Sequence, residues 1–111
     1  MRVLLFVFLL LMGCAGSKPV IPVWLHQKLL QAERNPNSYV EVWQYDYKKQ
    51  RVYYFIPACC DRLTELYNAE GKLVCYPAGG ISGQGDGKCR KFLTGRKNGE
   101  LIWRPKVALV D

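Results

Sequence analysis

The sequence contains a single histidine, His26, and no Cys-x-x-Cys pair. General acid–base catalysis needs positioned histidine, aspartate or glutamate side chains, and thiol oxidoreductases depend on a Cys-x-x-Cys motif. No Ser/His/Asp spacing typical of a nucleophilic triad is present. His26 falls outside the apolar stripe of a predicted helix, so we expect it to be exposed. The sequence therefore predicts no catalytic residue, no cofactor and no enzymatic activity.

A long apolar run is also missing. Residues 3–12 are entirely apolar after the basic start Met1-Arg2, but about 20 apolar residues are needed to cross a bilayer. A basic start followed by a short apolar stretch is typical of a secretory signal. Leu11-Met12-Gly13-Cys14 resembles a bacterial lipobox, in which the cysteine is acylated. An ordinary signal peptide cut near Ala15 is the alternative interpretation.

We therefore expect a signal peptide at residues 1–13, a lipidated tether at 14–20, and one small domain at 21–111. Acyl chains on Cys14, such as palmitate, would anchor the protein in membrane lipid, since each buried methylene contributes about 0.8 kcal/mol. Ala15, rather than aspartate, follows the modified cysteine, a choice similar to that of outer-membrane lipoproteins. The expected location is the cell envelope, at the outer membrane.

Apart from Cys14, the chain has four cysteines, and an even number in an exported protein favours disulfides. They are Cys59, Cys60, Cys75 and Cys89. Three pairings are open. A bond between two adjacent cysteines is strained, so we expect Cys59 and Cys60 each to pair with Cys75 or Cys89. A zinc site and reactive thiols are the alternatives. Two adjacent thiolates chelate a metal awkwardly, so no metal site is predicted.

Positive charge exceeds negative charge, with 16 Lys and Arg against 9 Asp and Glu. The excess lies near the C-terminus, where residues 88–106 carry one acidic group, Glu100. A field of this sign attracts polyanions, for which an envelope offers anionic lipid or acidic glycan rather than nucleic acid. A solvated, solubilising surface is the alternative interpretation. The candidate contacts are Lys88, Arg90, Lys91, Arg96 and Lys97.

Apolar periodicity predicts a helix followed by a β-hairpin. From Pro22 onward an apolar stripe recurs at helical spacing, and the helix should end at Asn35-Pro36. Residues 39–56 alternate as a hairpin that turns near Lys48-Lys49. The helical stripe comprises Ile21, Leu25, Leu29 and Ala32, with Trp24 beside it.

The expected hairpin register places Tyr45 opposite Val52 and Trp43 opposite Tyr54 on one face. The opposite charges of Asp46 and Arg51 then meet on the other face, which supports this register. We expect the aromatic face to cover the helix, although an exposed binding platform is the alternative. Two lysines make a poor two-residue turn, so a longer loop is the alternative.

A second hairpin is predicted around Asn68-Ala69-Glu70-Gly71, between strands at 66–67 and 73–75. A Cys60–Cys75 bond would lock its base. A turn at 95–99 and a strand at 101–103 complete the chain. The expected fold class is α+β: one N-terminal helix packed on a small antiparallel sheet of two β-hairpins plus a C-terminal strand, stapled by disulfides.

Residues 77–89 are too rich in glycine for a helix or a central strand. The dinucleotide fingerprint does not fit, because it needs a strand before it and a helix after it in a βαβ unit. The Walker loop does not fit, because Lys88 is followed by Cys89 rather than Ser or Thr. An Ω-type structural loop is the main interpretation. A ligand or ion loop is the alternative, although one carboxylate is too few to form a calcium cage. Its candidate residues are Gly83, Gly85, Asp86 and Gly87.

Four segments resemble a family of small Gram-negative lipoproteins whose domain has no assigned activity. They are residues 21–25, 52–54, Cys59-Cys60-Asp61, and 83–89 with its Gly-Asp-Gly-Lys-Cys run. The resemblance implies a disulfide-bearing envelope domain. This chain departs from the family pattern at Lys49, where glycine is usual, and at Arg90-Lys91, where Pro-Asp is common. The resemblance therefore does not imply the basic end.

These features favour a lipid-anchored, non-catalytic envelope domain that binds an envelope protein, an acidic glycan or a lipid. An inhibitor of secreted hydrolases is the alternative, because rigid loops suit the tight complexes that such inhibitors form.

Overall fold

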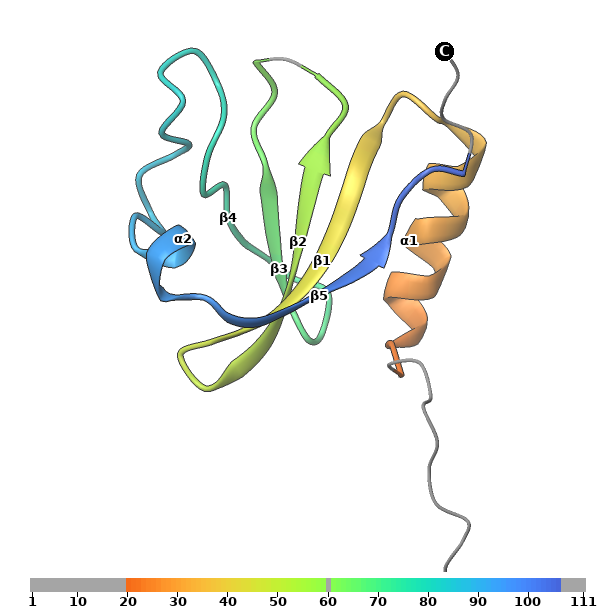
Figure 1. The fold of residues 1–111 in the computed structure, drawn as a ribbon, viewed down its shortest axis with the longest axis horizontal. Helices are drawn as coiled ribbons and strands as arrows, with labels where there is room; N and C mark the ends of the chain where they lie inside the picture. Colours follow the sequence, from red (N-terminus) through yellow and green to blue (C-terminus); the bar gives the residue numbers. More distant parts are fainter. Residues whose placement is uncertain (1–19, 60, 107–111) are drawn as a thin grey trace, which may run out of the picture.

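A helix packs on one side of a five-stranded antiparallel sheet, so the α+β fold class is confirmed (Figure 1). The computed structural model describes residues 20–59 and 61–106. The predicted signal peptide, most of the tether with Cys14, Cys60 and the last five residues lie outside the described residues. The strand order is β4-β3-β2-β1-β5. The elements are α1 Val23–Arg34, β1 Tyr39–Tyr47, β2 Gln50–Pro57, β3 Glu65–Asn68, β4 Leu73–Cys75, α2 Phe92–Gly95 and β5 Lys97–Trp103.

The helix α1 follows the predicted apolar stripe. It starts after Pro22 and buries Leu25, Leu29 and Ala32, while His26 is exposed as expected. The Trp24 indole N–H donates to the backbone oxygen of Ala69 at 2.8 Å, which ties the first turn of α1 to the β3–β4 turn. Neither helix in the described part of the chain has the length and apolar character needed to span a bilayer.

The first hairpin has the predicted register. Tyr45 pairs with Val52, Trp43 with Tyr54 and Asp46 with Arg51. The predicted turn at Lys48-Lys49 is confirmed, because Tyr47 pairs with Gln50 and only these two lysines lie between the strands. The alternative of a longer loop does not hold. Both lysines adopt left-handed backbone angles, with φ of 53° and 65°. This is the geometry that a tight two-residue turn demands, and it is unfavourable for a residue with a Cβ.

Replacing Lys49 by glycine is expected to raise the free energy of unfolding by about 1 kcal/mol, because glycine adopts positive φ without steric cost. The measurement is urea unfolding of the purified protein. Lys49→Ala is the matched control, since it removes the same charge but keeps a Cβ at φ 65°. If Lys49→Ala gained as much as Lys49→Gly, charge rather than backbone strain would be the cause.

The prediction that α1 covers the face of Tyr45 and Trp43 is wrong, because the sheet is covered on both faces. Strand β2 buries four consecutive residues, 52–55, so side chains on both of its faces are buried. Under α1 lie Leu25, Leu29, Val42, Tyr53 and Phe55. On the opposite face, a second core consists of Val52, Tyr54, Leu66, Cys75 and Phe92, with Trp43, Tyr45 and Tyr47 packed against them. Helices α1 and α2 therefore flank opposite sides of the sheet (Figure 1).

The predicted second hairpin is present, with Leu66 paired to Cys75 and the Gly71 N–H donating to Asn68 O at 3.1 Å. The predicted turn at 95–99 is only partly present. Strand β5 already begins at Lys97, inside that segment, and pairs with β1.

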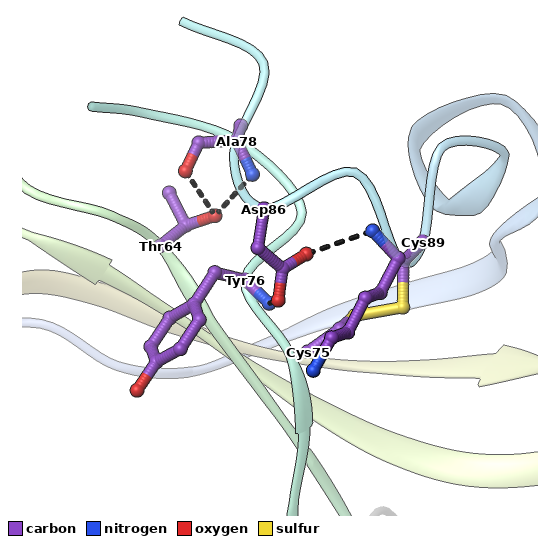
Figure 2. The surroundings of a disulfide bond; sticks show 7 residues. Thr64, Cys75, Tyr76, Ala78, Asp86 and Cys89 are labelled. Atoms are coloured by element: carbon purple, nitrogen blue, oxygen red, sulfur yellow. Dashed lines mark hydrogen bonds between the residues drawn. A yellow bond between two sulfur atoms is a disulfide. The ribbon is translucent and has the colours of Figure 1, made fainter. Parts of the chain in front are cut away.

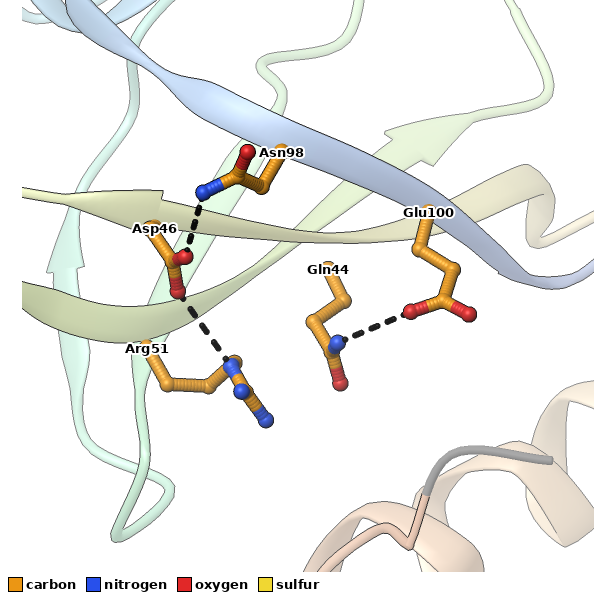
Figure 3. A network of polar contacts seen from close by, with 5 residues as sticks. All are labelled: Gln44, Asp46, Arg51, Asn98 and Glu100. Atoms are coloured by element: carbon orange, nitrogen blue, oxygen red, sulfur yellow. Dashed lines mark hydrogen bonds and ion pairs between the residues drawn. The ribbon is translucent and has the colours of Figure 1, made fainter. Parts of the chain in front are cut away.

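A kink at Asn98 explains why turn-like residues continue as a strand. Asn98 has φ 54° where the β1–β5 register shifts, and its amide donates to Asp46 Oδ2 at 2.8 Å. Figure 3 shows this contact, the Arg51–Asp46 pair, and the Gln44 amide donating to Glu100 at 3.2 Å. The Asn98 and Arg51 contacts lower the pKa of Asp46. Pairing with β1 thus gives Lys97 and Asn98 backbone and side-chain partners that a local turn would lack.

Candidate functional site

The glycine-rich segment is closed by a disulfide between Cys75, at the end of β4, and Cys89 (Figure 2). The two Cα atoms are 6.2 Å apart, within the usual range for a disulfide. The prediction that Cys75 and Cys89 each pair with Cys59 or Cys60 is therefore wrong, as is a Cys60–Cys75 bond. Cys59 is also disulfide-bonded. In the chain-entropy model, closing a loop of this length stabilises the fold by about 3 kcal/mol.

Asp86 holds the segment together from within. Its carboxylate accepts hydrogen bonds from the backbone N–H groups of Tyr76 at 3.1 Å and Lys88 at 2.9 Å. The Asp86 N–H in turn donates to Tyr76 O at 2.9 Å. The bond from the Lys88 N–H and that from Tyr76 lower the pKa of Asp86, so the carboxylate is ionised at neutral pH. Both carboxylate oxygens accept from the backbone, which favours the structural-loop interpretation over an ion cage. Figure 2 shows Asp86 beside Tyr76 and the disulfide.

The start of the segment is fixed to the residue that precedes β3. The Ala78 N–H donates to Thr64 Oγ1 at 3.0 Å, and the Thr64 hydroxyl donates back to Ala78 O at 3.3 Å (Figure 2). The Thr64 N–H adds a backbone bond to the same oxygen at 2.9 Å. Together with the disulfide and Asp86, these contacts hold the segment at both ends and in its middle. The glycine-rich segment is therefore a braced loop rather than a flexible linker.

The braced loop encloses a hollow of about 500 Å³. All four predicted loop residues, Gly83, Gly85, Asp86 and Gly87, line it. Arg90 supplies its charged side chain and the exposed Leu93 an apolar wall. The structure thus brings the predicted loop residues together with a predicted basic residue. Because Asp86 is occupied by the loop backbone, the side chain in this hollow best suited to an anion is that of Arg90.

The five predicted basic contacts are separated by the fold. Lys88, Arg90 and Lys91 are exposed on either side of Cys89, and we call these three the basic loop face. Arg96 is half-buried, with its guanidinium carbon 4.9 Å from the centre of the Tyr45 ring and 5.7 Å from that of Phe92. Lys97 lies on β5 opposite Asp46. Arg96 therefore packs on the second core, and Lys97 belongs to a different surface.

A second hollow, of about 220 Å³, lies beside the basic loop face, and sequence reasoning missed it. Lys48 and Lys88 both line it, although they are far apart in the chain. The composition of Lys48-Lys49 marks an unfavourable turn, but nothing in the local sequence connects this turn to a site. Only the assembly of strands β1, β2, β3 and β4 into one sheet brings these lysines to the same place.

A separate cluster of titratable groups joins Glu65 to two tyrosines at the α1 face. The hydroxyls of Tyr39 and Tyr67 each donate to Glu65 Oε1 at 2.8 Å. Burial raises the pKa of both phenols, and the bond to Glu65 raises it further. Both phenols thus stay protonated at neutral pH and act as donors to the carboxylate. This arrangement links β1 to β3 across β2 rather than forming a poised acid–base pair.

Comparison with known proteins identifies a family but no function. A family model described as a domain of unknown function, DUF6970, matches residues 28–105. No curated protein and no solved structure matches the chain. The match spans most of α1, the whole sheet, the braced loop and the disulfide. The resemblance to a family without assigned activity is therefore confirmed at that level, and the chain belongs to the DUF6970 family.

Proposed function

We propose that this protein is a non-catalytic binding domain, exported and anchored in the outer membrane through acyl chains on Cys14, which binds an acidic ligand. The observation that carries the ligand class is the basic loop face: Lys88, Arg90 and Lys91 are exposed on or next to a braced backbone. Within residues 20–59 and 61–106, the ion pairs join Arg51 to Asp46 and Arg104 to Glu41. The basic loop face is thus not neutralised by those carboxylates.

Rigidity favours binding here because little conformational freedom remains to be lost. Asp86 fixes the backbone at Lys88, and the disulfide fixes the residue between Lys88 and Arg90. Pre-organised contacts avoid part of the ordering cost of association. Exposed charges attract a polyanion at long range, and this attraction is screened by salt. The lipid anchor would keep such a domain next to envelope glycans and lipid headgroups.

Removing the three basic residues together is expected to weaken binding to an acidic polysaccharide about tenfold at low salt, a loss of about 1.4 kcal/mol. The triple variant is Lys88→Ala, Arg90→Ala, Lys91→Ala. The measurement is affinity for heparin as a function of ionic strength, with the full-length protein in neutral detergent. The matched control is Arg34→Ala, Lys97→Ala, Lys106→Ala, which removes three exposed charges elsewhere. Equal weakening by both variants, or binding that is insensitive to salt, would refute the basic loop face as the site.

An inhibitor of secreted hydrolases is the second candidate, favoured by one feature of the loop. Ile81 is 96% exposed at the tip of the turn closed by the Gly83 N–H to Gly80 O bond at 3.1 Å. A braced loop that presents an apolar side chain is the shape that inserts into a hydrolase pocket. Inhibition of a secreted protease at micromolar protein, lost on Ile81→Asp, would replace the acidic-ligand proposal.

A further inference from the structure

The hollow between Lys48 and Lys88 has an apolar floor made by three neighbouring strands. Val52 of β2 and Leu66 of β3 are almost fully buried there, while Val74 of β4 is 44% exposed. These strands are adjacent in the sheet, and all three side chains line the hollow. The hollow is lined by Tyr47, Lys48, Gln50, Val52, Leu66, Asn68, Val74, Lys88 and Cys89.

Both lysines at this hollow are held in place by the fold. The Lys88 N–H is bonded to Asp86, and the next residue is joined to Cys75. Lys48 has φ 53° in the tight β1–β2 turn, and its ammonium nitrogen lies 5.3 Å from the centre of the Tyr47 ring. Tyr47 itself packs edge-on against Phe92, with ring centres 5.2 Å apart.

The charge of this hollow is unbalanced. Its lining contains two lysines and no aspartate or glutamate. The rest of the lining includes the aliphatic side chains of Val52, Leu66 and Val74 and the amide residues Gln50 and Asn68. A purely polar anion would leave the apolar floor unused, and an uncharged apolar molecule would leave the lysines without a partner. The composition therefore matches a molecule that carries both an anionic group and an apolar group.

We propose that the hollow between Lys48 and Lys88 binds an amphipathic anion, a phosphate or carboxylate group attached to a short alkyl chain. Its volume of about 220 Å³ is below the range of about 300–1,000 Å³ typical of pockets for drug-sized ligands. The occupant is thus a small molecule or one end of a larger lipid. This inference rests on the proposed function and deepens it by naming the ligand class.

The test is a titration of the full-length, isotope-labelled protein in phosphatidylcholine nanodiscs with hexyl phosphate, followed by methyl NMR. We expect saturable shifts of the Val52, Leu66 and Val74 methyl groups. Affinity should exceed that for inorganic phosphate by more than about tenfold, because burying methylenes strengthens binding. Equal affinity for the two phosphates, or shifts outside the hollow only, would overturn the proposal.

Two variants separate this proposal from the basic loop face. Lys48→Gln should weaken hexyl phosphate binding about fivefold through loss of one partly exposed charge contact, and Val74→Ser should weaken it through the apolar part. Neither residue belongs to the basic loop face, so heparin binding should change little. Lys49→Gln is the matched control, since Lys49 shares the turn and the positive φ but does not line the hollow. Equal effects of Lys48→Gln and Lys49→Gln would overturn the assignment.

The source of the ligand is decided by a second arm of the experiment. Nanodiscs that contain an anionic phospholipid replace the neutral ones, with no hexyl phosphate added. Shifts of the same three methyl groups would identify a membrane lipid as the occupant. Shifts that appear only with free hexyl phosphate would identify a soluble small molecule. Both results support the proposal, while the absence of shifts in both arms refutes it without touching the heparin result.

Discussion

Replacing Phe92 by alanine is expected to lower the free energy of unfolding by about 4 kcal/mol, near the upper end for a single core substitution. Phe92 is fully buried and is the buried residue of the short helix α2. Its ring meets those of Tyr45, Tyr47 and Tyr54, with centres 5.0 to 5.7 Å apart. No other helix in the described residues covers this face of the sheet (Figure 1), so its removal opens the second core.

Urea unfolding measures this loss, and Leu93→Ala is the control. Leu93 is adjacent in the same helix but 41% exposed, so its truncation should change stability by less than about 0.5 kcal/mol. Amide exchange adds a spatial readout. Protection should fall around Val52 and Leu66, below Phe92, more than around Leu25 and Leu29 under α1. A uniform fall in protection, or equal losses for both variants, would show that α2 does not stabilise a separate core.

Gly85→Ala is the second large effect, with an expected loss of about 3 kcal/mol. About 1 kcal/mol of this comes from forcing a Cβ into a left-handed backbone, since φ of Gly85 is 71°. The remainder comes from collision, because the new Cβ would overlap Tyr76 O and lie 2.7 Å from Ala78 N. Both atoms belong to backbone that cannot rotate away. The hydrogen bonds between Tyr76 and Asp86 must then open, which leaves polar groups without partners.

Gly83→Ala measures the cost of the left-handed backbone alone, so comparison with Gly85→Ala gives the cost of the collision. Gly83 has a similar φ of 79°, but a Cβ there would meet nothing within 4 Å. Its substitution should therefore cost only about 1 kcal/mol. The two variants are compared by urea unfolding and by the amide NMR shift of Lys88, whose N–H is bonded to Asp86. That shift should move in Gly85→Ala and stay in Gly83→Ala. Equal losses of stability would mean that the loop is not braced as described.

The basic loop face and the smaller hollow are connected through Lys88. This residue belongs to the basic loop face and also lines the smaller hollow. An acidic polymer or lipid headgroup held by Arg90 and Lys91 would thus lie next to a place for an alkyl group. The two binding assays share Lys88 but differ at Lys48 and Arg90, so each proposal can fail alone.

Local patterns determined the elements and the pairing of neighbours. The stripe of Leu25, Leu29 and Ala32 predicted α1, and alternation with the Asp46–Arg51 pair predicted the β1–β2 register. The Asn68–Gly71 turn predicted the β3–β4 hairpin. Each of these depends on residues close together in the chain, whose geometry is fixed by backbone periodicity and turn chemistry.

The tertiary structure alone decided which face of the sheet α1 covers, which cysteines pair and which lysines meet. Both faces of β2 are apolar, so alternation could not choose the side for α1, whereas the burial of Phe92 on the opposite face did. Cys75 met Cys89 because the braced loop returns to the end of β4. Lys48 met Lys88 through the order of strands in the sheet. These contacts join distant segments, and their free energy depends on the whole packed core rather than on any local stretch of sequence.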